Sequence, residues 1–235
     1  MIEFTGERIV PGSKTCEPLF AQKMYQEHIA RYLFAAQLAG GRAVLDIGCG
    51  VGYGSRALAL HGAARVAAFD ASAEAIEHAR LNYAHPAVEF SVSDARTFQY
   101  DERFGLITCF ELIEHVENQP EVIRRAAAHL EDDGLLVIST PRSLGLARSA
   151  FHVRELTGYE FEALLAGWFP HVAWFVENNH FSSLVTAGAP RQLQRIYTMH
   201  DQFAAGMSDY LVAVASRQPF DAAAIAAQLV VNDDK

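Results

Sequence analysis

Four glycines occur within seven residues, directly after a short apolar strand, in the stretch VLDIGCGVGYGS at residues 44–55. Such a run predicts a loop, because glycine is disfavoured inside regular elements. A glycine-rich backbone lets a ligand approach closely, and a helix expected over residues 55–60 would present its first N–H groups to a polar ligand. The pattern indicates a nucleotide-type cradle formed by Gly48, Gly50, Gly52 and Gly54.

The glycine spacing does not fit a dinucleotide site. The pattern G-x-G-x-x-G/A fails when it is counted from Gly48 or Gly50. It matches from Gly52, but that frame begins too far beyond the strand to form its turn. Asp46 at the strand end would repel a pyrophosphate and attract a cation. The loop therefore favours a ligand that carries positive charge.

The composition bounds the class of protein and its partners. A chain of 235 residues with 51% hydrophobic content predicts one large α/β domain, or a core with a small appendage. The net charge of -9, with three lysines among 19 basic residues, disfavours nucleic acid as a partner. A large RNA or DNA substrate is therefore not expected.

Three cysteines cannot form a disulfide framework, which favours a reduced, cytoplasmic protein. The N-terminus does not resemble a signal peptide, and no apolar window has the length of a membrane span. The composition leaves the oligomeric state open.

Acidic residues also follow the next two predicted strands. Asp70 ends a strand at residues 65–70, at an offset that suits a carboxylate accepting from two ribose hydroxyls. Asp94 comes just after a strand at residues 88–92. The alternatives are a surface acid for Asp70 and a turn residue for Asp94.

A second group of chemically capable residues, ELIEHV, follows an apolar strand at residues 104–110. Ligands of open α/β sheets bind beyond the carboxyl ends of the strands, so Glu111, Glu114 and His115 are expected in the active-site layer. If the segment is helical, Glu111 faces the other two at i+3 and i+4. The group would hold a divalent cation or act as a general base. The alternative is a His115 that Glu111 satisfies without metal.

The glycine stretch, followed in order by Asp70 and Asp94-Ala95, resembles the motifs of class I S-adenosylmethionine-dependent methyltransferases over most of residues 42–217. The resemblance implies S-adenosyl-L-methionine as the cofactor. It also implies an α/β fold with a seven-stranded Rossmann-like sheet, helices on both faces and an antiparallel last strand. The cofactor-binding residues that it implies are Asp46, Gly48, Gly50, Gly52, Asp70, Ala71, Asp94, Ala95 and Phe110.

The predicted organisation has three parts. An arm and a covering helix occupy residues 1–40, the methyltransferase core occupies 41–217, and a helical tail occupies 218–235. The last strands are predicted at residues 135–140, 171–176 and 210–216. An insertion at 177–209 exceeds an ordinary hairpin loop, and it is expected to serve specificity or oligomerisation.

Two further resemblances bear on the acceptor. FTGERIVPG and EHIARYLFA are similar to the prelude of bacterial methyltransferases of surface-glycan and sugar biosynthesis. The E-x-x-E-H string is similar to the metal-binding motif of small-RNA 3′-end methyltransferases and of ubiquinone-pathway O-methyltransferases. Those families take another histidine from the segment after strand five. The implied ligands of Mg²⁺ or another divalent cation are Glu111, Glu114, His115 and His152.

Together these features predict methyl transfer to a small-molecule oxygen, such as a sugar or glycan hydroxyl, with Glu114 and His115 as catalytic residues. Direct displacement needs alignment, and a hydroxyl of high pKa also needs a base or a cation. One alternative is a metal-free enzyme that uses His115 as general base on another oxygen or nitrogen. Others are a non-catalytic cofactor-binding partner protein and, more distantly, a dehydrogenase.

Overall fold

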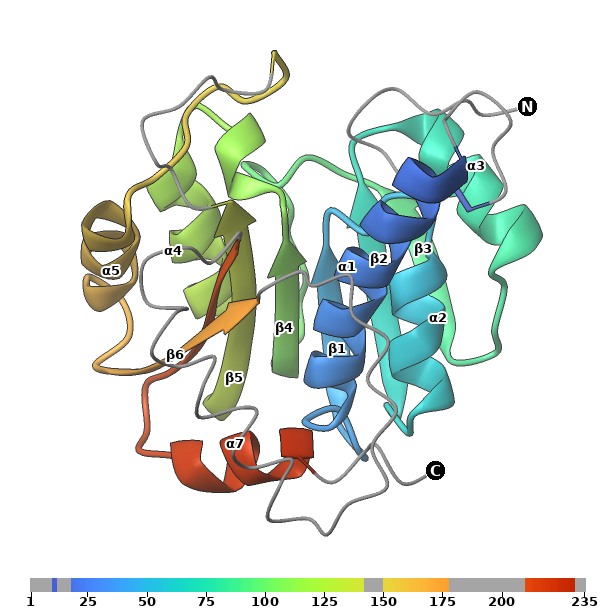
Figure 1. Ribbon diagram of the computed structural model, residues 1–235. Coiled ribbons are helices and arrows are strands. Elements are labelled where there is room, and N and C mark those ends of the chain that lie inside the picture. Colours follow the sequence, from blue (N-terminus) through green and yellow to red (C-terminus); the bar gives the residue numbers. More distant parts are fainter. Residues whose placement is uncertain (1–9, 12–17, 142–149, 178–209, 231–235) are drawn as a thin grey trace, which may run out of the picture.

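Seven strands form one mixed sheet in the computed structural model, which describes residues 10–11, 18–141, 150–177 and 210–230 (Figure 1). The strand order is β3-β2-β1-β4-β5-β7-β6, and β7 is antiparallel to both of its neighbours. This arrangement confirms the predicted sheet. The strands are β1 Ala43–Ile47, β2 Arg65–Asp70, β3 Val88–Val92, β4 Phe104–Phe110, β5 Leu130–Pro141, β6 His171–Glu177 and β7 Tyr210–Ser216.

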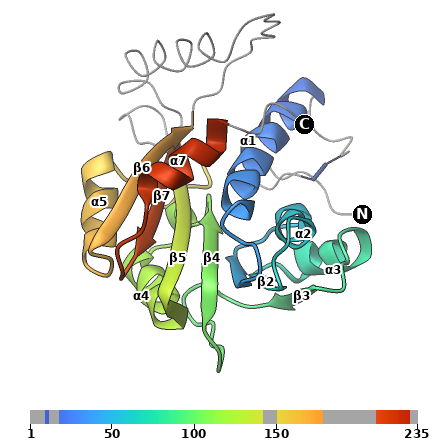
Figure 2. The ribbon, with the colours of Figure 1, turned by 90° about the horizontal axis from the view of Figure 1, so that it is seen from below.

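Helices cover both faces of the sheet, as Figures 1 and 2 show. One buried apolar cluster joins α1, α2, α3 and α7 to one face, and a second joins α4 and α5 to the other. All seven residues of β4 are buried, as expected for a central strand covered on both sides. The helices are α1 Pro18–Ala36, α2 Tyr53–Leu60, α3 Ala73–Asn82, α4 Gln119–His129, α5 Gly158–Ala166 and α7 Ala222–Val230.

Two elements differ from the sequence expectations. Helix α4 lies in a stretch to which the patterns above assign no element, although Pro120 in its first turn and buried Val122 and Ile123 are typical of an amphipathic helix. Strand β5 begins at Leu130 rather than at residue 135, because Leu130 pairs with Phe104 before a register shift. Residues 131–134 are therefore an irregular part of the strand.

Helix α5 shows how a local signal fixes an element boundary. The Thr157 hydroxyl accepts from the Glu160 backbone N–H, and the Glu160 carboxylate accepts from the Thr157 N–H, which forms a capping box. This cap starts the helix at Gly158 and positions the segment that carries His152 just before it. The predicted insertion, apart from Glu177, lies outside the described residues.

Helix α1 docks against the glycine-rich corner through Tyr32. The Tyr32 ring is 4% exposed, meets Phe110 edge-on at 5.0 Å between centroids, and lies against Gly54. Gly52 has a left-handed φ of 92°, and a Cβ there would lie 2.7 Å from the Ala79 Cβ. The corner therefore needs glycine at both positions. No described helix combines the length and apolarity needed to cross a membrane.

We expect Gly54→Ala to lower the free energy of unfolding by about 1–3 kcal/mol, because its methyl group would overlap the buried Tyr32 ring. Denaturant unfolding measures this change. The matched control is Gly40→Ala, since nothing lies within 4 Å of the position that its Cβ would take. Equal stability of the two variants would contradict the proposed contact.

Candidate functional site

A pocket of about 370 Å³ lies beyond the carboxyl ends of the central strands. The structure places five of the predicted cofactor-binding residues in its lining: Gly48, Asp70, Ala71, Asp94 and Ala95. These residues come from the segments that follow β1, β2 and β3. His115, which follows β4, also lines the pocket. The glycine corner and the E-x-x-E-H segment therefore share one cavity.

The Asp70 carboxylate is held by the backbone on two sides. Its Oδ2 accepts from the Gly50 N–H at 3.0 Å, and its Oδ1 accepts from the Ser72 N–H at 2.8 Å. Each carboxylate oxygen has a further lone pair. The carboxylate is thus fixed at the pocket wall while keeping the capacity to accept from ligand hydroxyls.

Asp46 lies outside the lining of this pocket and is fully buried. It accepts hydrogen bonds from the Ser55 hydroxyl at 2.6 Å, the Thr108 hydroxyl at 2.8 Å and the Tyr32 hydroxyl at 3.2 Å. Burial raises the pKa of Asp46 to about 6, although the three hydrogen bonds oppose this rise. In the structure Asp46 connects α1, α2 and β4 rather than facing a ligand.

The remaining predicted cofactor residues also support the cavity from outside its lining. Gly50 donates its N–H to Asp70, and Gly52 packs closely on α3. The Phe110 ring points into the core cluster on the α1 side, where it contacts Tyr32. These residues shape the cradle through the backbone and through packing.

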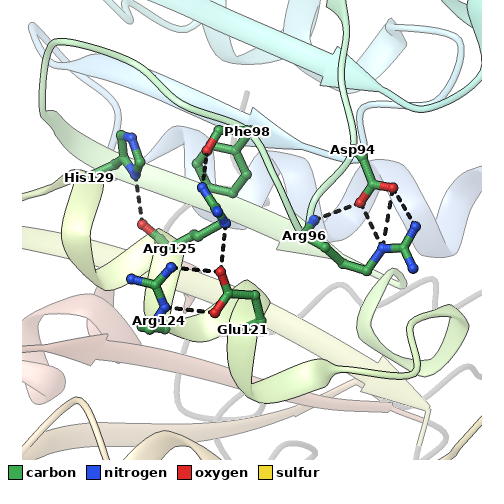
Figure 3. Close-up of polar contacts among 7 residues, drawn as sticks. All are labelled: Asp94, Arg96, Phe98, Glu121, Arg124, Arg125 and His129. Atoms are coloured by element: carbon green, nitrogen blue, oxygen red, sulfur yellow. Dashed lines mark hydrogen bonds and ion pairs between the residues drawn. The ribbon is translucent and has the colours of Figure 1, made fainter.

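Asp94 at the pocket rim forms a close pair with Arg96 (Figure 3). The Arg96 side chain donates to both carboxylate oxygens, with the shortest contact at 2.6 Å. These hydrogen bonds lower the pKa of Asp94 to about 2. Both residues are partly exposed, so their pairing is accessible to solvent.

A separate polar network in Figure 3 holds α4 against the loop after Asp94. Glu121 accepts from Arg124 and Arg125, and Arg125 also donates to the Phe98 carbonyl at 2.7 Å. His129 accepts from the Tyr100 N–H at 3.1 Å. This network fixes the loop that carries Asp94 and Arg96.

A carboxylate and two imidazoles meet beside the pocket. Ligand-type atoms of Glu114, His115 and His152 all lie within 4.8 Å of one another. The two imidazole rings meet edge-on, with 5.0 Å between their centroids. Three of the four metal ligands expected from the sequence therefore lie together in the structure, at the end of β4 and in the segment after β5.

Hydrogen bonds at Nδ1 orient both imidazoles. The Nδ1 atom of His115 lies 3.0 Å from the Phe151 carbonyl oxygen, and that of His152 lies 2.7 Å from Glu155 Oε1. A carbonyl oxygen and an ionised carboxylate oxygen can only accept hydrogen bonds. Each imidazole therefore carries its proton on Nδ1. In the neutral rings each Nε2 is then the acceptor atom, which is the arrangement of metal-ligating histidines.

Glu114 supplies a buried oxygen without a donor. The residue is 1% exposed; its Oε2 accepts from the Thr140 hydroxyl at 3.2 Å, but its Oε1 has no hydrogen-bond partner in the part of the chain described. The His115 Nε2 atom lies 3.9 Å from that Oε1. Burial raises the pKa of Glu114, and the nearby charge of Glu111 adds to the rise.

Glu111 stands outside this group of three. Its carboxylate accepts from the Ser139 hydroxyl at 2.6 Å, and its φ of 49° is in the left-handed region. A continuous helix cannot start there, so the segment contains only the short 3₁₀ turn η1, Ile113–His115. The helical pairing considered from the sequence therefore does not form, although the charge of Arg31 acts on the Glu111 carboxylate.

Arg31 from the covering helix α1 is buried among acidic and aromatic groups. Its Nη1 lies 2.6 Å from Glu177 Oε2, and its guanidinium lies 4.5 Å from the centre of the Tyr210 ring. Burial alone would lower the pKa of Arg31, but Glu111 and Glu177 outweigh this effect and raise it. Burial raises the pKa of Glu177 to about 7, against the opposing charge of Arg31.

Several lining residues escaped sequence reasoning because they carry no motif of their own. They lie next to motif residues, and the strand-end position was the available signal for Phe69 and Ser93. The others face the cavity only once η1 and the segment after β5 are folded. The unpredicted lining residues are Phe69, Ser93, Arg96, Leu112, Val116, Glu117 and Val153.

A family model described as a methyltransferase domain matches residues 20–195, which is more than half of the chain. The chain belongs to this methyltransferase family. The match confirms the family expected from the glycine loop and the acids that follow it. A probable S-adenosylmethionine-dependent methyltransferase of Mycobacterium tuberculosis is 30% identical to this chain over 172 residues.

The aligned region covers 70% of this chain and 60% of the mycobacterial relative, so the chain spans less than two thirds of that protein. A ubiquinone biosynthesis O-methyltransferase of Coxiella burnetii is 38% identical over 109 residues, which are 43% of this chain and 44% of the relative.

The chain shares its fold with the N-methyltransferase NodS of Bradyrhizobium japonicum, whose structure is a complex with S-adenosyl-l-homocysteine. The TM-score is 0.62 at 19% sequence identity, and the match covers 82% of this chain and 87% of NodS.

We expect Asp46→Asn to flatten the pH dependence of stability. The pKa of Asp46 rises from its usual 3.8 to about 6 on folding, so the folded state holds the proton more tightly. Its contribution to the free energy of unfolding therefore falls as the pH rises from 3.8 to 6. As the pH rises through this window, the free energy of unfolding of Asp46→Asn should increase relative to that of the natural protein by on the order of 3 kcal/mol.

Urea unfolding at closely spaced pH values measures that gain. Glu177 titrates in both proteins, so its contribution cancels from the difference. Parallel stability curves for the two proteins would contradict the assignment of the pH dependence to Asp46.

Proposed function

We propose that this chain is an S-adenosylmethionine-dependent methyltransferase that methylates an oxygen of a small molecule, such as a sugar or glycan hydroxyl, with help from a divalent metal ion. The observation that carries the proposal is the group of Glu114, His115 and His152 at the edge of the pocket. His115 belongs both to that group and to the pocket lining. An acceptor held at the group would therefore lie next to the methyl donor.

The pocket has the polar groups that an adenosine ligand requires. Asp70 keeps lone pairs for the ribose hydroxyls after binding Gly50 and Ser72. Asp94 and Ala95 lie in the same lining after β3, where the adenine would bind. S-Adenosylmethionine supplies an electrophilic methyl group, and the fixed pocket walls would align it with the acceptor.

The three residues fit a metal ion by their chemistry. Glu114 Oε1 is buried without a donor, and both histidines are held by Nδ1 so that Nε2 is the acceptor. Two imidazoles and one carboxylate suit ions such as Mn²⁺ or Zn²⁺ better than Mg²⁺, which prefers oxygen ligands. A bound divalent cation would act as a Lewis acid toward the acceptor hydroxyl.

The surrounding residues keep this group in place. Thr140 and the Val153 N–H bond to the side chain and the carbonyl of Glu114, and Gln119 ties the Ile113 and Arg154 carbonyls together. Ser139 holds Glu111 beside the group. We propose that Glu111 supports the site as a neighbouring carboxylate rather than as a metal ligand.

Two observations support an oxygen acceptor. The relative from Coxiella burnetii is named as an O-methyltransferase. The sequence FTGERIVPG resembles preludes found in sugar and glycan methyltransferases, which supports a sugar hydroxyl. A hydroxyl keeps its proton at neutral pH, so the carboxylate and imidazole group matches what such an acceptor needs.

A second candidate function is metal-free methyl transfer with His115 as general base. It is favoured by the Phe151 carbonyl, which fixes the tautomer of His115 so that Nε2 can accept a proton. Glu114, 3.9 Å from that nitrogen, would stabilise the resulting imidazolium. This mechanism would serve another oxygen or nitrogen acceptor and would not need His152 as a ligand.

We expect Asp70→Ala to weaken S-adenosylhomocysteine binding at least tenfold, because the ribose acceptors and the Gly50 anchor are both lost. Isothermal titration calorimetry measures the dissociation constant. Asp101→Ala is the matched control, since Asp101 is exposed and outside the pocket lining. Similar affinities for both variants would argue against this cofactor site.

The metal proposal predicts that calorimetry detects one Mn²⁺ or Zn²⁺ site, which His152→Ala abolishes because it removes one of three ligands. His61→Gln should leave binding unchanged, since His61 lies at the end of α2. If no divalent ion binds, and chelator leaves methyl transfer intact, the general-base alternative is favoured. In that case His115→Ala should abolish activity, whereas His152→Ala should not.

A further inference from the structure

Arg96 donates hydrogen bonds to the carboxylate of Asp94, which the proposed function assigns to the adenine amino group. The Arg96 backbone N–H donates to Asp94 Oδ1 at 2.7 Å, and Nε lies 3.0 Å from Oδ1 and 3.2 Å from Oδ2. Nη2 donates to Oδ2 at 2.6 Å (Figure 3). A carboxylate oxygen has about two lone-pair sites, so these contacts fill both oxygens of Asp94.

An adenine amino group would compete with this arrangement. The amino group is a hydrogen-bond donor, as is every N–H of Arg96, so both need the same acceptor atoms. Asp94 and Arg96 both line the pocket, so the competition takes place inside the cavity. The amino group can donate to Asp94 only after the Arg96 side chain has broken its hydrogen bonds with at least one of the two carboxylate oxygens.

A second carboxylate in the pocket lining is available to Arg96. Glu117, which follows η1, lines the same cavity and is exposed. Its charge acts favourably on the Arg96 guanidinium. The Arg96 side chain is 51% exposed, so moving it breaks no buried packing. Moving Arg96 from one partly solvated ion pair to another changes the free energy little.

We propose that Arg96 sets the affinity and base selectivity of the adenine site by competing for Asp94, and that Glu117 receives Arg96 when a 6-aminopurine binds. The proposal rests on the proposed function, because it assumes that Asp94 reads the adenine amino group. Arg96 lies outside the recognised motifs, and in this proposal it satisfies the Asp94 carboxylate while no adenine is bound.

Calorimetric titration with S-adenosylhomocysteine tests the competition. Arg96→Ala should bind this ligand about two- to fivefold more tightly, because Asp94 is released from an exposed ion pair. The analogue that carries unsubstituted purine, without the 6-amino group, should bind the variant and the natural protein equally. Arg103→Ala is the charge-matched control, because Arg103 pairs with Asp132 and lies outside the pocket lining.

The role of Glu117 is tested by a double-mutant cycle. Glu117→Gln should weaken S-adenosylhomocysteine binding about two- to fivefold when Arg96 is present, and should have no effect in Arg96→Ala. Weaker binding to Arg96→Ala, an equal change for both ligands, or additive effects in the cycle would overturn the proposal. If the natural protein and all variants fail to bind S-adenosylhomocysteine, the proposed function itself fails.

Discussion

The architecture of the site depends on one buried carboxylate. Asp46, at the end of the central strand β1, receives hydroxyl donors from α1, α2 and β4. A buried carboxylate is costly without donors, so each of these hydroxyls is tied to the position of its own element. The glycine corner, the covering helix and the strand that leads to Glu111 are thereby fixed relative to one another.

This constraint explains why two kinds of chemistry lie side by side. The corner after β1 and β2 presents backbone and carboxylate groups suited to a nucleoside, while the segment after β4 presents a carboxylate and an imidazole. Parallel strands bring both sets to the same edge of the sheet. His115 belongs both to the pocket lining and to the group of Glu114, His115 and His152, so the two sets of residues adjoin at this side chain.

The sequence predicted most of this arrangement because the strands are strongly patterned and end in chemically distinctive residues. Asp70 and Asp94 line the pocket, as expected. Glu114 and His115 lie beside His152, although more than thirty positions separate them in the sequence. Asp46 and Phe110 illustrate what could not be predicted. Motif membership does not say which side of the strand end a side chain takes, and both point toward α1.

Glu111 and Arg96 show two further limits. The left-handed φ of Glu111 depends on tertiary contacts such as the Ser139 hydrogen bond, so helical spacing misplaces its carboxylate. Arg96 belongs to no motif, and its pairing with Asp94 depends on the local turn. Helix α4 has regularly spaced apolar residues, but its N-cap Asn118 makes no capping side-chain hydrogen bond, so its start carries a weak local signal.

The ion pair between Arg31 and Glu177 has a consequence for how the protein folds. Its partners are 146 positions apart, so α1 leaves the ribosome long before the strand that anchors it exists. Contacts of such sequence separation form late, because the intervening chain must be ordered first. The tie between α1 and the far edge of the sheet should therefore form among the final steps, after the local contacts of Tyr32 with Asp46. In a growing chain, α1 would lie on the glycine corner before it is anchored to β6 by this ion pair.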